Sequence, residues 1–225
     1  MSDTAAITSE AAGHAAEQGH DDHHGHYGVP GYDPLAWKMG MWLFLFTEVL
    51  LFGALFIAFA AYLYTYPWEF ARAASQLSIP VGTFNTLVLL TSSMTVAVAI
   101  GAMQRGKKEL AIKLLDFTVG CAALFCIIKA FEWGGKFEHG IYPGSAHLAT
   151  LEYGQQIYFG LYFTMTGLHA LHVIIGAALI LWCRAKIKNG SVTPERIVFM
   201  DNIGLYWHLV DLVWIFLFPL FYLLG

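Results

Sequence analysis

A single glutamate interrupts a long apolar stretch near the start of this sequence. Glu48 lies in residues 44–52, FLFTEVLLF, where Thr47 is the only other polar residue. An ionisable side chain in such surroundings is costly unless it is paired or faces a protected cavity, which makes it a candidate functional residue. Because the charged form is disfavoured there, we expect Glu48 to be neutral or hydrogen-bonded to a polar group of another helix. Two roles stay open: a buried acid that carries protons, or a side chain that only fastens two helices together.

A second group of ionisable residues lies in residues 108–137. Lys129 and Glu132 are three positions apart, hence on one face of a helix, and each can neutralise the other where neither could stand alone. We favour this structural neutralisation over a role in transport.

Histidines supply the third candidate group. His169 and His172 are three positions apart, and His208 and Asp211 repeat this spacing further along the chain. Histidines on facing helices of a bundle can ligate haem or a metal ion. No Glu-x-x-His pair or His–Cys cluster accompanies them, so we expect no intrinsic metal site. The favoured fate is a hydrogen bond across a helix interface, to Asp211, to Glu132 or to a backbone carbonyl.

The composition is that of a membrane protein. Hydrophobic residues make up 57% of the 225 residues and charged residues only 12%, against about 25% charged in soluble domains. The formal net charge of −4 gives no basic surface for nucleic acid. The three cysteines form no CxxC motif, and we interpret them as buried apolar thiols.

Five apolar runs are long enough to cross a bilayer core, which takes roughly 20 helical residues. They are too long for barrel strands and do not alternate, so the predicted fold is an all-α, polytopic membrane bundle of five transmembrane helices. The predicted spans are residues 37–66, 80–103, 108–137, 156–184 and 202–224.

The distribution of Lys and Arg predicts the orientation. With a cytoplasmic N-terminus, nine Lys and Arg residues lie on the inner side and two, Arg72 and Lys136, on the outer side. We interpret residues 1–35 as a mobile polar tail rich in histidine, and residues 36–225 as the membrane domain. Capture of a transition metal by the tail is the weaker alternative for its histidines.

Six motifs follow one another along the chain: residues 39–44 (MGMWLF), 48–53 (EVLLFG), 85–93 (NTLVLLTSS), 132–133 (EW), 166–176 (TGLHALHVIIG) and 206–216 (YWHLVDLVWIF). Together they resemble subunit III of the haem-copper respiratory oxidases, the cytochrome c oxidase subunit III family. The resemblance covers residues 37–225 in the family's order and excludes the tail. Many members have seven spans, whereas this chain begins at what would be their third, which resembles the short, five-helix bacterial type.

The resemblance implies a helper without redox centres that packs beside the catalytic subunit, subunit I, in the bacterial inner (plasma) membrane. It implies a V-shaped bundle with phospholipids in a cleft, whereas haem and copper belong to the catalytic partner. Glu48 matches the family's carbodiimide-reactive carboxyl, and support of proton uptake, durability and oxygen access is the implied function. Interhelical or lipid contact is the role we assign to Lys129, Glu132, His169, His172, Trp207, His208 and Asp211.

Other functions stay open on the residues alone. Subunit III of a quinol oxidase, or the related accessory protein of nitric oxide reductase, has the same requirements, since other subunits choose the electron donor and the gas. A stand-alone proton-coupled transporter is disfavoured because five spans offer no inverted repeat and no broken helix. A haem-binding membrane cytochrome would use His169, His172 or His208.

Overall fold

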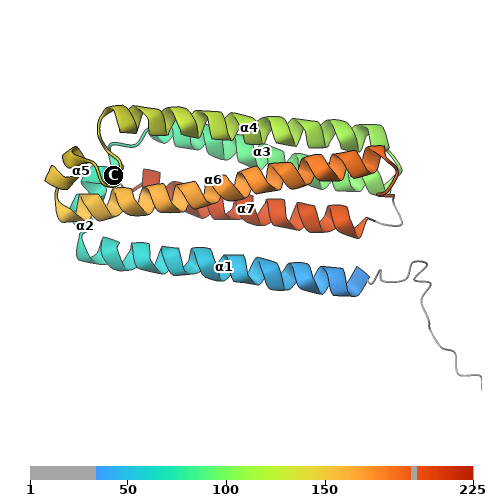
Figure 1. Ribbon diagram of the computed structural model, residues 1–225, viewed down its shortest axis with the longest axis horizontal. Coiled ribbons are helices and arrows are strands. Elements are labelled where there is room, and N and C mark those ends of the chain that lie inside the picture. Colours follow the sequence, from blue (N-terminus) through green and yellow to red (C-terminus); the bar gives the residue numbers. More distant parts are fainter. Residues whose placement is uncertain (1–33, 194–196, 225) are drawn as a thin grey trace, which may run out of the picture. The chain divides into compact units, whose positions relative to one another are not determined.

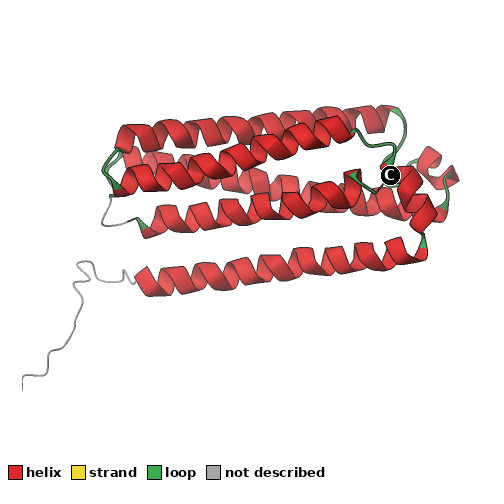
Figure 2. Cartoon of the chain, turned by 180° about the vertical axis from the view of Figure 1, so that it is seen from behind, coloured by secondary structure: helices red, strands yellow, loops and turns green. Residues whose placement is uncertain are grey.

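Long helices dominate the computed structural model, which describes residues 34–193 and 197–224 (Figure 1). Within these ranges there are helices and no strands, and five of the helices are long and apolar enough to cross a membrane (Figure 2). The fold is therefore an all-α membrane bundle with five spans, as predicted. The helices are α1 (Pro34–Thr65), α2 (Pro67–Ala74), α3 (Ile79–Gln104), α4 (Lys108–Glu138), α5 (Ala146–Thr150), α6 (Tyr153–Lys188) and α7 (Val198–Tyr222).

Two short helices were not predicted. We expected residues 67–79 and 138–155 to be connections, but α2 and α5 lie within them. Pro67 opens α2, where its missing N–H costs no hydrogen bond, and Ser145 caps α5 by accepting from the Leu148 N–H at 3.0 Å. The last span begins at Val198 rather than at residue 202, and Asp201 in its first turn suits the positive end of the helix dipole.

Glycines in the left-handed conformation end three of the spans, α3, α4 and α6, and those that follow α3 and α6 lie at the same end of the bundle (Figure 1). Gly106 follows α3 with φ 72° and Gly190 follows α6 with φ 71°. In each case the glycine N–H and the next N–H bond back to carbonyls of the last turn, as in Lys107 N to Ala102 O at 2.9 Å. These turns reverse the chain at the same end of the bundle, so the spans run alternately up and down.

The helices α3, α4, α6 and α7 pack closely on one another, whereas α1 packs less closely and is the least buried span (Figure 1). An aromatic cluster joins one end of α1 and α2 to α6 and α7. Phe59 lies 5.2 Å from Phe70 and 5.0 Å from Phe221 between ring centroids. Tyr158, which packs against all three rings, donates its hydroxyl proton to the Phe221 carbonyl at 2.6 Å. All four side chains are fully buried, so this cluster fixes α1 at that end.

Some of the residues for which predictions were made lie outside the described part of the chain. The histidine-rich tail, residues 1–35, lies outside the described residues except for Pro34 and Leu35, which begin α1, and Arg196 is also outside them. The cytoplasmic placement of the N-terminus and the V-shaped arrangement stay predictions.

A close helix contact at Gly176 provides a test of the packing. A Cβ at Gly176 would lie 2.8 Å from the Trp207 ring, whereas a Cβ at Gly160 of the same helix meets nothing within 4 Å. We expect Gly176→Ala to lower the free energy of unfolding by roughly 1–3 kcal/mol, because α6 and α7 must move apart. Gly160→Ala should be neutral or slightly stabilising, since alanine favours helix. Thermal unfolding of the purified complex in detergent measures both, and equal effects would contradict the contact.

Candidate functional site

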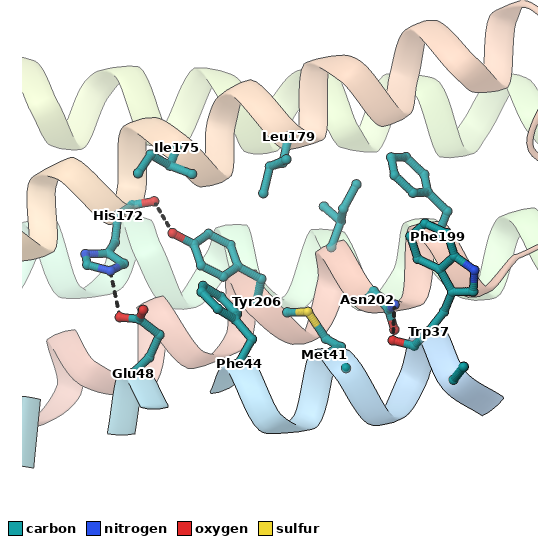
Figure 3. A pocket seen from close by; sticks show the side chains of 13 residues that line it. Trp37, Met41, Phe44, Glu48, His172, Ile175, Leu179, Phe199, Asn202 and Tyr206 are labelled. Atoms are coloured by element: carbon teal, nitrogen blue, oxygen red, sulfur yellow. Dashed lines mark hydrogen bonds and ion pairs between the residues drawn. The ribbon is translucent and has the colours of Figure 1, made fainter. Parts of the chain in front are cut away.

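The glutamate in the first span pairs with a histidine of another helix. Oε2 of Glu48 on α1 lies 2.8 Å from Nε2 of His172 on α6 (Figure 3). The side chains are 14% and 12% exposed, so the pair is largely removed from the surface. Glu48 therefore has the interhelical hydrogen bond that its apolar surroundings require, although the sequence did not identify His172 as its partner.

The second ring nitrogen of His172 fixes how many protons the pair holds. Nδ1 lies 2.7 Å from the Leu168 carbonyl oxygen, which can only accept, so Nδ1 must carry a proton. Nε2 then either accepts a proton from a neutral Glu48 or, as part of an imidazolium, donates to a carboxylate. In both arrangements one proton is shared between Glu48 and His172 and the pair carries no net charge. The geometry thus holds a single transferable proton at mid-helix.

A cavity of about 690 Å³ opens beside this pair, between α1, α6 and α7 (Figure 3). Glu48 and His172 lie in its wall, and the Tyr206 hydroxyl reaches the His172 carbonyl at 3.3 Å. Asn202 bonds the Trp37 carbonyl at 3.2 Å further along. The rest of the lining is mainly apolar, and includes Met41, Phe44, Ile175, Leu179, Phe199 and Ile203.

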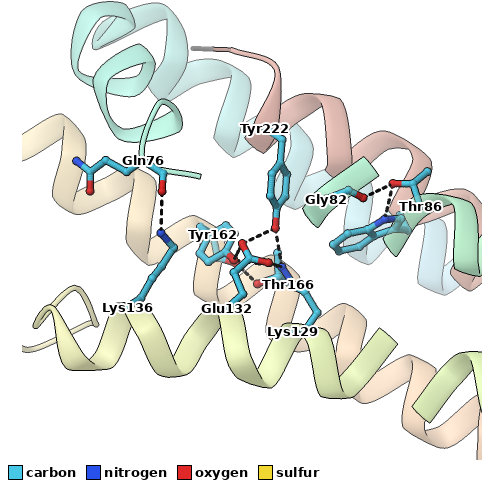
Figure 4. A network of polar contacts seen from close by, with 10 residues as sticks. Gln76, Gly82, Thr86, Lys129, Glu132, Lys136, Tyr162, Thr166 and Tyr222 are labelled. Atoms are coloured by element: carbon cyan, nitrogen blue, oxygen red, sulfur yellow. Dashed lines mark hydrogen bonds and ion pairs between the residues drawn. The ribbon is translucent and has the colours of Figure 1, made fainter. Parts of the chain in front are cut away.

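A second polar cluster joins α4, α6 and α7 (Figure 4). Nζ of Lys129 lies 3.1 Å from Oε2 of Glu132, and the two side chains are 4% and 9% exposed. The Tyr162 and Tyr222 hydroxyls donate to Oε1 of Glu132 at 2.7 and 2.6 Å, and each accepts from Lys129, at 3.1 and 2.8 Å. The Lys129–Glu132 pair thus meets a hydroxyl from each of two other helices.

Near this cluster, Lys136 on α4 reaches another part of the chain. Its Nζ lies 3.4 Å from the carbonyl oxygen of Gln76, in the connection between α2 and α3 (Figure 4). The ammonium also lies over the rings of Phe159 and Tyr162, at 5.5 and 5.9 Å from their centroids. The distribution of Lys and Arg predicts that Lys136 lies on the outer side of the membrane, and in the structure its side chain is largely buried.

His169 makes interhelical contacts but not the hydrogen bond that was expected for it. Both of its ring nitrogens lack a hydrogen-bond partner among the described residues, and the ring is fully buried. It packs between Phe125 and Trp214, at 5.5 and 5.1 Å between centroids. His172, three residues further along α6, faces α1 instead and pairs with Glu48, because α1 and α4 contact different faces of α6.

Two side chains of the motif on the last span form hydrogen bonds with α3. Nδ1 of His208 lies 2.6 Å from the Ser93 hydroxyl, and Nε1 of Trp207 donates to the Ser92 hydroxyl at 3.1 Å. Asp211 is buried, and neither carboxylate oxygen makes a hydrogen bond of normal geometry. His172 of α6 and His208 of α7 thus have different partners, Glu48 of α1 and Ser93 of α3.

Tyrosines are the site residues that the sequence did not identify. Tyr162 and Tyr222 complete the Lys129–Glu132 cluster, and Tyr206 lines the cavity. The described residues contain no group of three or more His, Cys, Asp or Glu arranged to hold a metal ion.

Comparison with known proteins assigns the chain to a family. Residues 23–225 match the family described as cytochrome c oxidase subunit III. A Pseudomonas aeruginosa protein named cytochrome bo(3) ubiquinol oxidase subunit 3 is 29% identical over 98% of each chain. The cytochrome c oxidase subunit 3 of Cyanidium caldarium is 32% identical over 85% of this chain and 68% of its own.

A third relative joins two subunits in one polypeptide. The Aeropyrum pernix protein named heme-copper oxidase subunit I+III is 29% identical over 83% of this chain, which spans 22% of that protein. Relatives of the matched type are thus subunits of cytochrome c and quinol oxidases. With five apolar spans and a family match over nearly its whole length, the chain belongs to the cytochrome c oxidase subunit III family, the multi-pass accessory subunits of haem-copper oxidases.

Proposed function

We propose that this chain supports proton uptake and durability of the catalytic subunit, subunit I, through the proton shared by Glu48 and His172. The 2.8 Å contact between them, in the wall of a cavity, carries the proposal. A protonatable pair that is neutral as a whole can persist at mid-membrane, where a lone charge is costly. The cavity gives this pair a route toward the surface between α1 and α6.

The setting of the proposal is the plasma membrane of a bacterium, with the N-terminus in the cytoplasm. Subunit I holds the haem and copper, and α1, as the least buried span, has the apolar surface that a neighbouring subunit or lipid would cover. The contribution of this chain is therefore made through packing, bound lipid and protonatable groups.

We further propose that the cavity holds phospholipid. Its lining is mainly apolar along Met41, Ile175 and Leu179, which suits an acyl chain. A lipid there would fill the space between α1 and the other spans and would limit access of water to Glu48.

The Lys129–Glu132 cluster has a structural role in this proposal. Its charges are paired and its tyrosine hydroxyls come from α6 and α7, so it fastens the ends of three helices together. The same role is proposed for Trp207 and His208 through their bonds to α3.

Glu48→Gln tests the proton role. The glutamine amide can still donate to Nε2 of His172, so the amount of assembled complex should be unchanged, but the shared proton is lost. We expect slower proton uptake or a several-fold shorter active lifetime during turnover, measured with a pH-sensitive dye and by loss of oxygen consumption. Glu109→Gln, at an exposed position of α4, is the control. If uptake, turnover and lifetime all equal those of the parent, Glu48 is purely structural.

Filling the cavity tests the lipid role. Gly40 lines the cavity and a Cβ there meets nothing within 4 Å, so Gly40→Phe would place a ring in the cavity without a clash at the backbone. We expect fewer phospholipids to co-purify with the complex, as counted by mass spectrometry of extracted lipid. Gly53→Phe is the matched control, because Gly53 lies on α1 in open space and does not line the cavity. Equal lipid content in the two variants would contradict a lipid in the cavity.

Removing one charge tests the structural cluster. Lys129→Met leaves Glu132 buried without its cation, and we expect a loss of about 3–5 kcal/mol in the free energy of unfolding. The double variant Lys129→Met, Glu132→Gln should recover part of that loss, because no unpaired charge remains. Thermal or detergent-induced unfolding of the purified complex measures both. Lys113→Met, at an exposed position of α4, should change little, and a comparable loss there would remove the argument for the pair.

A further inference from the structure

Three buried side chains in the bundle interior have polar atoms without hydrogen-bond partners. Asn85 on α3 and His169 on α6 are 0% exposed, and Asp211 on α7 is 3% exposed. No hydrogen bond of normal geometry is made, within the described part of the chain, by the amide nitrogen and oxygen of Asn85, by the two ring nitrogens of His169 or by the two carboxylate oxygens of Asp211. Buried polar atoms in folded proteins nearly always have a partner, and lipid cannot supply one. Three such residues in one bundle therefore require a partner of another kind.

The three residues lie at neighbouring levels of their helices, close to the level of Trp214. The Trp214 ring lies 5.1 Å from that of His169, and its Nε1 donates to the Thr86 hydroxyl at 3.0 Å. Asn85 is adjacent to Thr86 in α3, and Asp211 lies one helical turn before Trp214 in α7. The three residues thus belong to three helices, of which α7 packs on both α3 and α6, and they lie at similar heights along the bundle.

Further polar groups lie on both sides of these three residues along the bundle. On one side, the Ser93 hydroxyl is engaged with Nδ1 of His208 at 2.6 Å, and its single proton can satisfy at most one of the two Asp211 carboxylate oxygens. His208 also lines a cavity of about 340 Å³ with Lys38 and Asp201. On the other side, Nζ of Lys129 lies 5.1 Å from the centroid of the Trp214 ring.

We propose that internal water molecules are bound between Asn85, His169 and Asp211. They form a hydrated path in the four-helix core that reaches from the cavity beside His208 toward Lys129. Water both donates and accepts, so it can satisfy an amide, an imidazole and a carboxyl group at once, and buried water typically makes about three hydrogen bonds to otherwise unpaired groups. The path lies among α3, α4, α6 and α7, apart from the Glu48–His172 pair and its cavity between α1, α6 and α7.

Radical footprinting of the intact oxidase complex distinguishes a hydrated interior from a dry one. X-ray pulses split bound water into hydroxyl radicals, which oxidise the side chains beside it even where bulk solvent is absent. Phe125 and Phe59 are both 0% exposed, but Phe125 contacts His169 whereas Phe59 lies within the aromatic cluster. We expect Phe125 and Trp214 to be oxidised several-fold faster than Phe59. Equal rates for Phe125 and Phe59 would overturn the proposal.

A variant locates the water. Asp211→Leu removes two of the acceptors and should reduce oxidation of Phe125 while leaving that of Phe59 unchanged; unchanged oxidation of Phe125 in an assembled complex contradicts the site. Should this variant fail to assemble, the comparison of the two phenylalanines in the parent complex still decides. Metal analysis of the same preparation of the complex adds a separate outcome: a metal ion at these three residues would replace water and refute the inference.

Discussion

Lipid offers no hydrogen-bond partner to a side chain, so each polar group within these spans must find its partner inside the protein. The bundle meets this constraint with pairs that cross helices. Glu48 of α1 meets His172 of α6, and Glu132 of α4 meets Lys129 together with hydroxyls from α6 and α7. Between apolar helices in lipid there is little hydrophobic driving force, and such contacts, together with close packing at small residues, decide which helices become neighbours.

The two polar systems differ in how firmly they are held. The Lys129–Glu132 cluster lies where α4, α6 and α7 pack closely, and its four polar groups satisfy one another. Glu48 lies on α1, which packs less closely and is fixed at one end by the aromatic cluster around Phe59. The Lys129–Glu132 pair is therefore surrounded by closely packed helices, whereas the Glu48–His172 pair lies beside a cavity. This difference in surroundings, rather than residue type, separates a structural role from the proposed functional one.

The spans were predictable because 18 or more apolar residues in a row have few alternatives to a membrane helix. Neither α2 nor α5 was predictable, since each is short and lies in a polar connection. Whether such a connection is helical depends on its packing, such as that of Phe70 of α2 against Tyr158. Glu48 was identifiable as an outlier in an apolar run, but its partner was not: which face of α6 meets α1 depends on helix rotation. For the same reason the sequence did not show that His172 meets α1, whereas His169 packs against rings of α4 and α7.

Under the proposed function, the contents of the cavity and the state of the shared proton are physically linked. A charged pair, carboxylate with imidazolium, is stabilised by nearby water, whereas the neutral pair is favoured in a dry, apolar surrounding. Both side chains lie in the cavity wall, so an acyl chain in the cavity favours the neutral pair and its replacement by water favours the charged one. The position of the proton then depends on what lies between α1 and α6, without any movement of the four closely packed helices.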